Sequence, residues 1–328
     1  GLSGKNIGKR KGLGNVTTLF YPEGQLLNTT ENRNACATAE ALAKAMARQT
    51  VLEGIALLCD EHHDLTVQVG PFLGRIPREE TALGIAEGTT RDIAILSRVG
   101  KPISFTVIGL EGENGTLVPL LSRRQAQEKT LDYILSHWEN GQVVSARVTH
   151  LEPFGAFVDI GCGIPSMIGV DRLSVSRISH PRDRLSPGQE ILAAVLGIDR
   201  ENRRVVLTHR ELLGTWEENA ALFRPGMTVP GYVRGIKDYG VFVELTPNLS
   251  GLAERQEGIR EGDRVSVYLK SILPDRMKIK LLIIDSLPDE ENPQPPLYFV
   301  TGGKLDRWCY APAGCPKPGS ETVFTPLP

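Results

Sequence analysis

Short stretches in which apolar and polar residues alternate recur along the chain, and they predict β-strands rather than long helices. Within residues 141–213, alternation or short apolar runs predict five strands, at residues 144–148, 157–160, 167–170, 190–198 and 204–208. The 34 glycines and 22 prolines fit many short strands joined by turns. Five short strands in about 70 residues predict a small β-barrel.

The predicted barrel is repeated along the chain. Residues 141–144 and 154–159 recur, with similar residues, at 226–229 and 239–244, which is an internal duplication with a period of about 85 residues. The sequence at residues 121–124 also resembles that at residues 207–210, so a further unit lies upstream. Between the units the apolar spacing becomes helical, as at Leu131, Ile134 and Trp138.

We therefore predict a mainly β chain: three tandem five-stranded barrels of the oligonucleotide/oligosaccharide-binding (OB) type, joined by short helices, with disordered N- and C-terminal segments. The predicted parts are a disordered basic segment at 1–35, a helix at 36–49, a divergent first barrel at 50–124, a linker helix at 125–139, a second barrel at 140–208, a linker helix at 209–224, a shortened third barrel at 225–286, and a Pro-rich linker with a C-terminal hairpin and tail at 287–328. The hairpin is expected at residues 298–308, around two consecutive glycines.

Charge is distributed unevenly among the predicted barrels. The whole chain has a formal net charge of -2, which gives no global attraction to nucleic acid. By segment, residues 50–122 carry a net charge of about -5, whereas residues 141–213 and 225–285 each carry about +1. The first barrel is therefore expected to be the least suited of the three to binding a nucleic acid, and any such contact elsewhere must rest on local basic faces and stacking.

Several classes of site find no support in the sequence. No phosphate loop, nucleophile elbow or paired carboxylates are visible, so no enzyme and no small-molecule substrate is expected. The odd cysteine count favours a reducing cytoplasm. Cys309 and Cys315 are a possible pair or metal site without neighbouring ligands, and His62 and His63 fit an acidic loop; we predict no metal and no cofactor. No run reaches the roughly 18 apolar residues of a membrane span.

Two aromatic side chains three residues apart occur in each of the two repeated units: Phe154 with Phe157, and Tyr239 with Phe242. Residues three apart share a face of a strand only if the chain bulges between them, which Gly155 permits. Exposed rings would let bases stack, at about 1 to 3 kcal/mol per base. The alternative, that the rings are core, is less favoured because the motif is duplicated and surrounded by arginines such as Arg147.

The order and spacing of several motifs in residues 141–213 resemble the RNA-binding domain named after bacterial small-subunit ribosomal protein S-one. These motifs are residues 141–144, 154–159, 198–201 and 204–208. The resemblance extends over most of residues 225–285 and, more loosely, over 50–124. It implies a short, three-domain form of the family. It also implies RNA-facing residues at Phe154, Phe157, Asp199 and Arg204 in the second barrel and at Tyr239, Phe242 and Lys278 in the third.

The chain departs from that family at one position. Where the domain usually has a histidine, this sequence has Gly169 in the second barrel and Glu254 in the third. His180 is a substitute only if its loop folds back toward the rings. In the first barrel Leu65, Val67 and Val69 occupy the corresponding strand without an aromatic pair, so the resemblance implies a docking role there.

The function expected from these features is binding of single-stranded mRNA by tandem barrels, as a cytoplasmic component or factor of the small (30S) ribosomal subunit in translation. The 30S subunit would be contacted through the first, acidic barrel. Two alternatives stay open: an RNA-processing accessory that presents RNA to a nuclease, and a protein-docking adaptor that has lost RNA binding.

Overall fold

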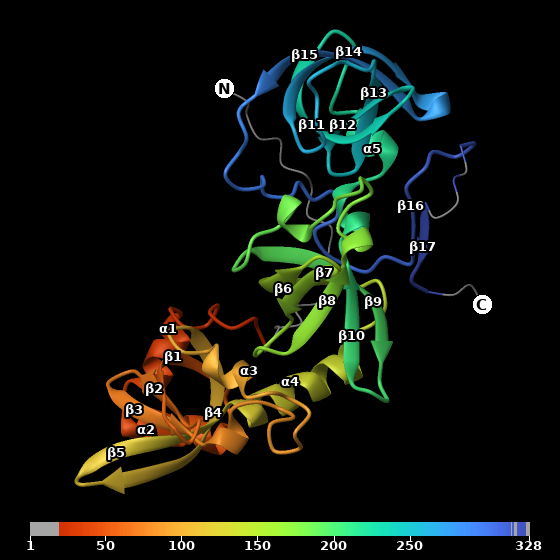
Figure 1. The fold of residues 1–328 in the computed structure, drawn as a ribbon. Helices are drawn as coiled ribbons and strands as arrows, with labels where there is room; N and C mark the ends of the chain where they lie inside the picture. Colours follow the sequence, from red (N-terminus) through yellow and green to blue (C-terminus); the bar gives the residue numbers. More distant parts are fainter. Residues whose placement is uncertain (1–19, 316, 318–319, 326–328) are drawn as a thin grey trace.

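The computed structural model describes residues 20–315, 317 and 320–325, and three closed five-stranded barrels follow one another in it (Figure 1). The prediction of a mainly β fold with three barrels is confirmed. The first barrel contains β1 (Leu52–Cys59), β2 (Leu65–Val69), β3 (Phe72–Ile76), β4 (Pro102–Glu113) and β5 (Thr116–Ser122). The second contains β6 (Val143–Glu152), β7 (Gly155–Asp159), β8 (Pro165–Gly169), β9 (Glu190–Asp199) and β10 (Arg204–Thr208). The third contains β11 (Thr228–Lys237), β12 (Gly240–Thr246), β13 (Leu249–Ala253), β14 (Arg264–Leu273) and β15 (Lys278–Leu287).

Alternation along each strand separates a core face from an outer face. In β7, Ala156 and Val158 are fully buried in the core of the second barrel, whereas Phe157 between them points outward. The third and fifth strands of each barrel pair in parallel and close the barrel. In the second barrel, for example, Met167 of β8 lies opposite Val206 of β10. Each barrel therefore has its own core, and every second residue of a strand is available for contacts outside it.

The helices differ in detail from those predicted. They are α1 (Thr30–Cys36), α2 (Ala39–Arg48), α3 (Ile93–Leu96), α4 (Arg123–His137) and α5 (Trp216–Ala220), with 3-10 turns at Arg78–Glu80, Val170–Arg172, Pro181–Asp183, Arg210–Leu213 and Pro274–Arg276. The helix predicted at 36–49 begins at Ala39, because the Thr38 hydroxyl caps its first turn. The linker helix predicted at 209–224 is split in two, since Gly214 takes a positive φ of 92° and Thr215 starts a new capping box.

The joint between the first and second barrels contains a buried ion pair. Residues 20–29 were predicted to be disordered, but they lie in this joint. Glu23 accepts hydrogen bonds from the Arg123 guanidinium at 2.6 and 3.0 Å and from the Ser104 amide at 2.7 Å. Its own amide donates to Asp159 of the second barrel at 2.8 Å. Residues 20–29 are held here because their side-chain and backbone groups pair with buried charges of distant segments, which the local pattern of apolar and polar residues does not reveal.

The pKa values in this joint follow from the same contacts. Burial alone would raise the pKa of Glu23, but the Arg123 guanidinium holds it below its ordinary value. Burial, with the nearby Glu23 charge, raises the pKa of Asp159 to about 6. Glu53 accepts from the amides of Gly24, Leu26 and Leu27, yet burial raises its pKa to about 7.

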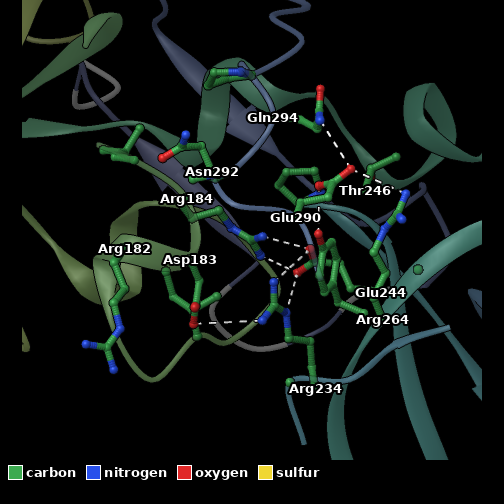
Figure 2. Close-up of a pocket in the computed structure, with 18 of the residues that line it drawn as sticks. Arg182, Asp183, Arg184, Arg234, Glu244, Thr246, Arg264, Glu290, Asn292 and Gln294 are labelled. Atoms are coloured by element: carbon green, nitrogen blue, oxygen red, sulfur yellow. Dashed lines mark hydrogen bonds and ion pairs between the residues drawn. The ribbon is translucent and has the colours of Figure 1, made fainter. Parts of the chain in front are cut away.

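The joint between the second and third barrels is also built on a buried acid. The Arg184 guanidinium, from the loop before β9, forms a two-point ion pair with Glu244 of β12, and Arg234 contacts the same carboxylate at 3.2 Å (Figure 2). Burial alone would raise the pKa of Glu244, but the two guanidinium groups hold it below its ordinary value. A cleft of about 1090 Å³ opens beside this pair, and residues 289–297 line one wall.

The C-terminal segment crosses the second barrel. A hairpin was predicted at residues 298–308 around two glycines, and this is wrong. Instead β16 (Arg307–Cys309) pairs with β17 (Glu321–Val323). The backbone near the glycines bonds to the barrel, since the Val143 amide donates to the Gly303 carbonyl at 2.9 Å. The predicted disordered tail thus contains a strand pair and buried residues such as Trp308 and Phe324; residues 1–19, 316, 318–319 and 326–328 lie outside the described part.

One buried histidine lies where this segment crosses the second barrel. Burial lowers the pKa of His209 to about 4, although the hydrogen bond from its Nδ1–H to the Leu173 carbonyl, at 2.8 Å, opposes this shift. Its Nε2 accepts from the Tyr298 hydroxyl at 3.0 Å. Between pH 6.5 and 4 the unfolded chain binds a proton at this position that the folded chain does not bind. The contribution of neutral His209 to the free energy of unfolding is therefore complete above about pH 6.5. It is lost as the pH falls toward 4, by about 3 kcal/mol at most.

This pH dependence is measured by urea unfolding at pH 7, 5.5 and 4.5 in the wild type and in His209→Gln, with tryptophan fluorescence as the signal. Asp159 and Glu53 have raised pKa values and so act in the opposite direction, but they are present in both proteins. The wild type should lose more stability than the variant as the pH falls. Equal losses in the two proteins would contradict the assignment.

Candidate nucleic-acid interface

The two predicted aromatic pairs lie on the outer surfaces of the second and third barrels. Phe154 is 56% exposed and Tyr239 is 69% exposed, while Phe157 and Phe242 are half-buried. The ring centroids of Phe154 and Phe157 are 5.8 Å apart at an interplanar angle of 86°, and those of Tyr239 and Phe242 are 6.1 Å apart at 89°. The two barrels therefore present nearly the same arrangement of rings, and none of the four belongs to a barrel core.

The rings share a face for a reason that the sequence did not predict. No bulge separates Phe154 from Phe157; Phe154 lies in the turn before β7, and its carbonyl accepts from the Val170 amide at 2.9 Å. The bulge lies across the pairing, in β6, where the register shifts between Val148 and His150. Gly155 is needed because a Cβ there would lie 2.6 Å from the Ile168 carbonyl oxygen of the neighbouring strand.

A third ring joins the pair in the second barrel. His150 stacks on Phe157 with centroids 4.3 Å apart and an interplanar angle of 7°. It faces Phe157 directly across the β6–β7 pairing, just after the bulge. Sequence reasoning missed His150 because strict alternation along β6 fails at the bulge; the signal available was its position opposite the second ring. The third barrel has Gly235 at this place, and the first has Leu58.

Direct strand pairing shows which residues lie beside the rings. In the second barrel Phe157 pairs with Met167, which pairs with Val206. In the third barrel Phe242 pairs with Leu252, which pairs with Lys280. We call these rows, with the turn aromatic of each barrel, the ring strips. The second strip is apolar along its row, whereas the third ends on a lysine that the sequence analysis did not single out.

Charged residues predicted for the interface lie at the starts of the fifth strands and, for Asp199, at the end of the fourth strand. Arg204 is exposed and precedes Val206 by two residues, so it shares the outer face; Lys278 stands in the same relation to Lys280. Asp199 pairs with Arg204, but it also accepts from the Asn202 side chain at 2.8 Å and from its amide at 3.1 Å. The Asn202 side chain lowers the pKa of Asp199, so this carboxylate caps the β9–β10 turn.

Two predicted residues are engaged elsewhere. The Arg147 guanidinium donates to Glu190 at 2.7 Å, in a row of β6 that pairs with Asp159 rather than with Phe157. His180 accepts from the Arg182 amide at 3.1 Å and caps a 3-10 turn in the loop that reaches the third barrel. Within the described residues no ring contact joins His180 to either phenylalanine.

The first barrel has a different outer row. Thr66 pairs with Leu58 on one side and with Arg75 on the other, and Arg75 pairs with Leu120. The turn position equivalent to Phe154 holds His63, whose ring is fixed by Asp92 at 2.7 Å. No aromatic pair is therefore present on this barrel at the place of the ring strips.

Other kinds of site have less support. Within the part of the chain that the structure describes, no three His, Cys, Asp or Glu side chains gather at metal-binding spacing. Cys309 and Cys315 are both free thiols. No helix among the described residues is long and apolar enough to cross a membrane.

Comparison with known proteins agrees with this geometry. Residues 138–210 match the family of the S1 RNA binding domain, which describes an RNA-binding module rather than a class of enzyme. The chain is similar to small ribosomal subunit protein bS1 of Leuconostoc lactis, at 31% identity over 70% of this chain and 55% of that protein. It is similar to the bS1 homolog of Bacillus subtilis at 30% identity over 56% of this chain and 51% of that protein.

The chain thus spans about half the length of these two relatives. Among solved structures, GSP13 from Bacillus subtilis matches 22% of this chain and 56% of its own at 27% identity, with a TM-score of 0.21. A multidomain protein with nucleic acid binding domains from Streptococcus pneumoniae matches 72% of this chain and 73% of its own at 16% identity, with a TM-score of 0.25. The relationship therefore rests on the sequence matches. They confirm the expected resemblance: the second barrel matches the S1 RNA binding domain, and the chain is similar to small ribosomal subunit protein bS1.

Proposed function

We propose that this chain binds single-stranded mRNA on the ring strips of its second and third barrels, as a cytoplasmic component or factor of the small ribosomal subunit in translation. The observation that carries the proposal is the pair of mutually perpendicular rings, one exposed and one half-buried, that recurs on two barrels with nearly equal spacing. Among the described residues these rings belong to no barrel core, and the outermost ring of each pair, Phe154 or Tyr239, is more than half exposed. Every base has a flat face, so stacking on such rings tolerates many sequences.

The residues around the rings suit this role. Arg204 in the second barrel and Lys278 with Lys280 in the third place positive charge on the outer face beside the rings, where phosphates of a bound strand would lie. Asp199 acts by shaping the turn that carries Arg204. Arg147 and His180, which the sequence also suggested, would contribute only by leaving their present partners.

The two barrels share this work unequally. The second has three rings, because His150 stacks on Phe157, whereas the third has two rings and an exposed acid, Glu254, where the family usually has a histidine. We expect the second barrel to bind RNA more tightly. Two weak sites in series raise the overall affinity through effective concentration while each contact stays reversible, which suits a message that moves.

The first barrel would attach the chain to the small ribosomal subunit. Its outer row lacks the rings, and its net charge is about -5 over residues 50–122, which disfavours RNA. Exposed Leu57, Leu58 and Leu73 on its surface suit contact with a protein.

The role of the ring strips in RNA binding is tested by fluorescence anisotropy with a labelled 20-nucleotide oligo-U across a salt series. Phe154→Ala/Phe157→Ala should weaken binding by about 1 to 3 kcal/mol for each base that loses its ring. The slope of affinity against salt should change little, because stacking releases no counterions. Tyr133→Ala is the control, since Tyr133 is an aromatic residue on α4 that stacks on His137 away from the strips.

Unchanged affinity in the double variant would contradict the proposal. The double variant could instead lose as much free energy of unfolding, measured by urea unfolding, as is expected when buried phenylalanines are truncated. That result would show that the rings support the fold.

Attachment to the ribosome is tested by co-sedimentation with purified 30S subunits. The full chain should sediment with the subunits. A chain carrying Leu57→Asp/Leu58→Asp on the first barrel should sediment less while keeping its affinity for oligo-U, because the charges disrupt the apolar contact alone. Loss of both activities, or of neither, would argue against separate roles for the barrels.

A further inference from the structure

One equivalent place on the three barrels is covered in two of them and bare in the third. It is the point where the fourth strand pairs with the fifth near the middle of the sheet. The paired residues are Thr106 and Ser122, Ala194 and Thr208, and Tyr268 and Leu282, in the first, second and third barrels. The equivalence follows from register, because Val143 and Thr228, at the starts of β6 and β11, pair with Ala194 and Tyr268.

In the first two barrels this place is buried. Thr106 is fully buried, and its hydroxyl donates to Gln125 of α4 at 2.5 Å. Ala194 is fully buried by Trp308 and Phe324 of the C-terminal segment, together with Leu212. A different part of the chain thus supplies the cover in each case.

In the third barrel the described residues provide no such cover. The fifth strand, β15, continues to Leu287, and the chain then leaves along the cleft rather than forming a helix over the sheet. Tyr268 is 38% exposed, Leu282 is 37% exposed and Ile284 is 54% exposed. This leaves an aromatic and aliphatic surface open on the outer side of β14 and β15.

Positive charge surrounds this surface. Lys270, Lys278 and Lys280 are exposed on the same two strands, and none of them makes an ion pair or hydrogen bond within the described residues. The acids on this stretch are Asp285 and, in the turn between the strands, Asp275. Three unpaired lysines beside a tyrosine favour a polyanion with flat, apolar groups over an uncharged apolar partner.

The surface is continuous with the ring strip of the third barrel. Lys280 is the last residue of the row that starts at Phe242, and it pairs with Ser271 of β14. Leu282 follows Lys280 by two residues on the same outer face and pairs with Tyr268. Two residues along a strand span about 6.6 Å, so Tyr268 lies within a short step of the end of the strip.

We infer that single-stranded RNA bound on the Tyr239–Phe242 rings continues across β15 onto β14, where Tyr268 stacks on a base and Lys270 contacts a phosphate. This inference rests on the proposed RNA binding and adds a second contact region to the third barrel. The charge of the lysines fits the phosphates, and the exposed tyrosine fits the bases. The third barrel thereby compensates for the missing histidine and the missing third ring.

The test compares Tyr268→Ala/Lys270→Gln with the wild type in anisotropy measurements on oligo-U of 20 and of 5 nucleotides. On the longer strand the variant should bind about fivefold or more weakly, and the salt slope should fall by about 0.7, because Lys270 no longer neutralises one phosphate. On the shorter strand, which the rings alone hold, the difference should shrink to less than about twofold. Lys44→Gln is the charge-matched control, since Lys44 lies on α2 of the first barrel without an ion pair.

The outcomes separate this inference from the proposed function. If Phe154→Ala/Phe157→Ala weakens binding but Tyr268→Ala/Lys270→Gln binds both RNA strands with the affinity of the wild type, the inference is wrong and the proposed function stands. If Phe154→Ala/Phe157→Ala also binds RNA with the affinity of the wild type, the proposed function itself is wrong. A variant that leaves RNA binding intact but converts a dimer into a monomer would show that the bare face joins two copies of the chain, which overturns the inference as well.

Discussion

The acid that ends each aromatic motif fixes how consecutive barrels meet. Asp159 and Glu244 occupy the same place in the repeat, two residues after the second ring, and each is buried in the joint with the preceding barrel. Because residues two apart on a strand point the same way, the outer face that carries the ring also carries the joint. The orientation of each ring strip is therefore tied to the barrel before it.

The buried acid of each joint is paired with a different kind of group. Asp159 accepts three backbone amides, from Glu23, Gly161 and Gly163, and burial still raises its pKa to about 6. Glu244 is held by two guanidinium groups and keeps a lowered pKa. Removing the groups that pair with either acid would leave a buried charge unpaired, and an unpaired buried charge strongly destabilises a protein. The repeat thus keeps the position of the acid while each joint supplies its own partner.

Local patterns predicted the repeated parts of the structure well. Alternation located the five strands of the second barrel, and the duplicated motif located both ring pairs, because these features depend on neighbours along the chain. The errors concern contacts between distant segments. The bulge at His150, the packing of residues 20–29 and the course of residues 298–309 depend on which barrel surface lies opposite, and a single sequence does not encode that in its local spacing. The third ring was missed for the same reason.

The proposed path of the RNA follows the ring strips of the second and third barrels. Ultraviolet crosslinking of a 4-thiouridine 20-mer to the full chain, with the attachment sites mapped by mass spectrometry, tests it directly. The crosslinks should fall at His150, Phe154 and Phe157 and, less abundantly, at Tyr239 and Phe242. Crosslinks confined to the first barrel, or to the cleft beside Arg184 and Glu244, would contradict this claim.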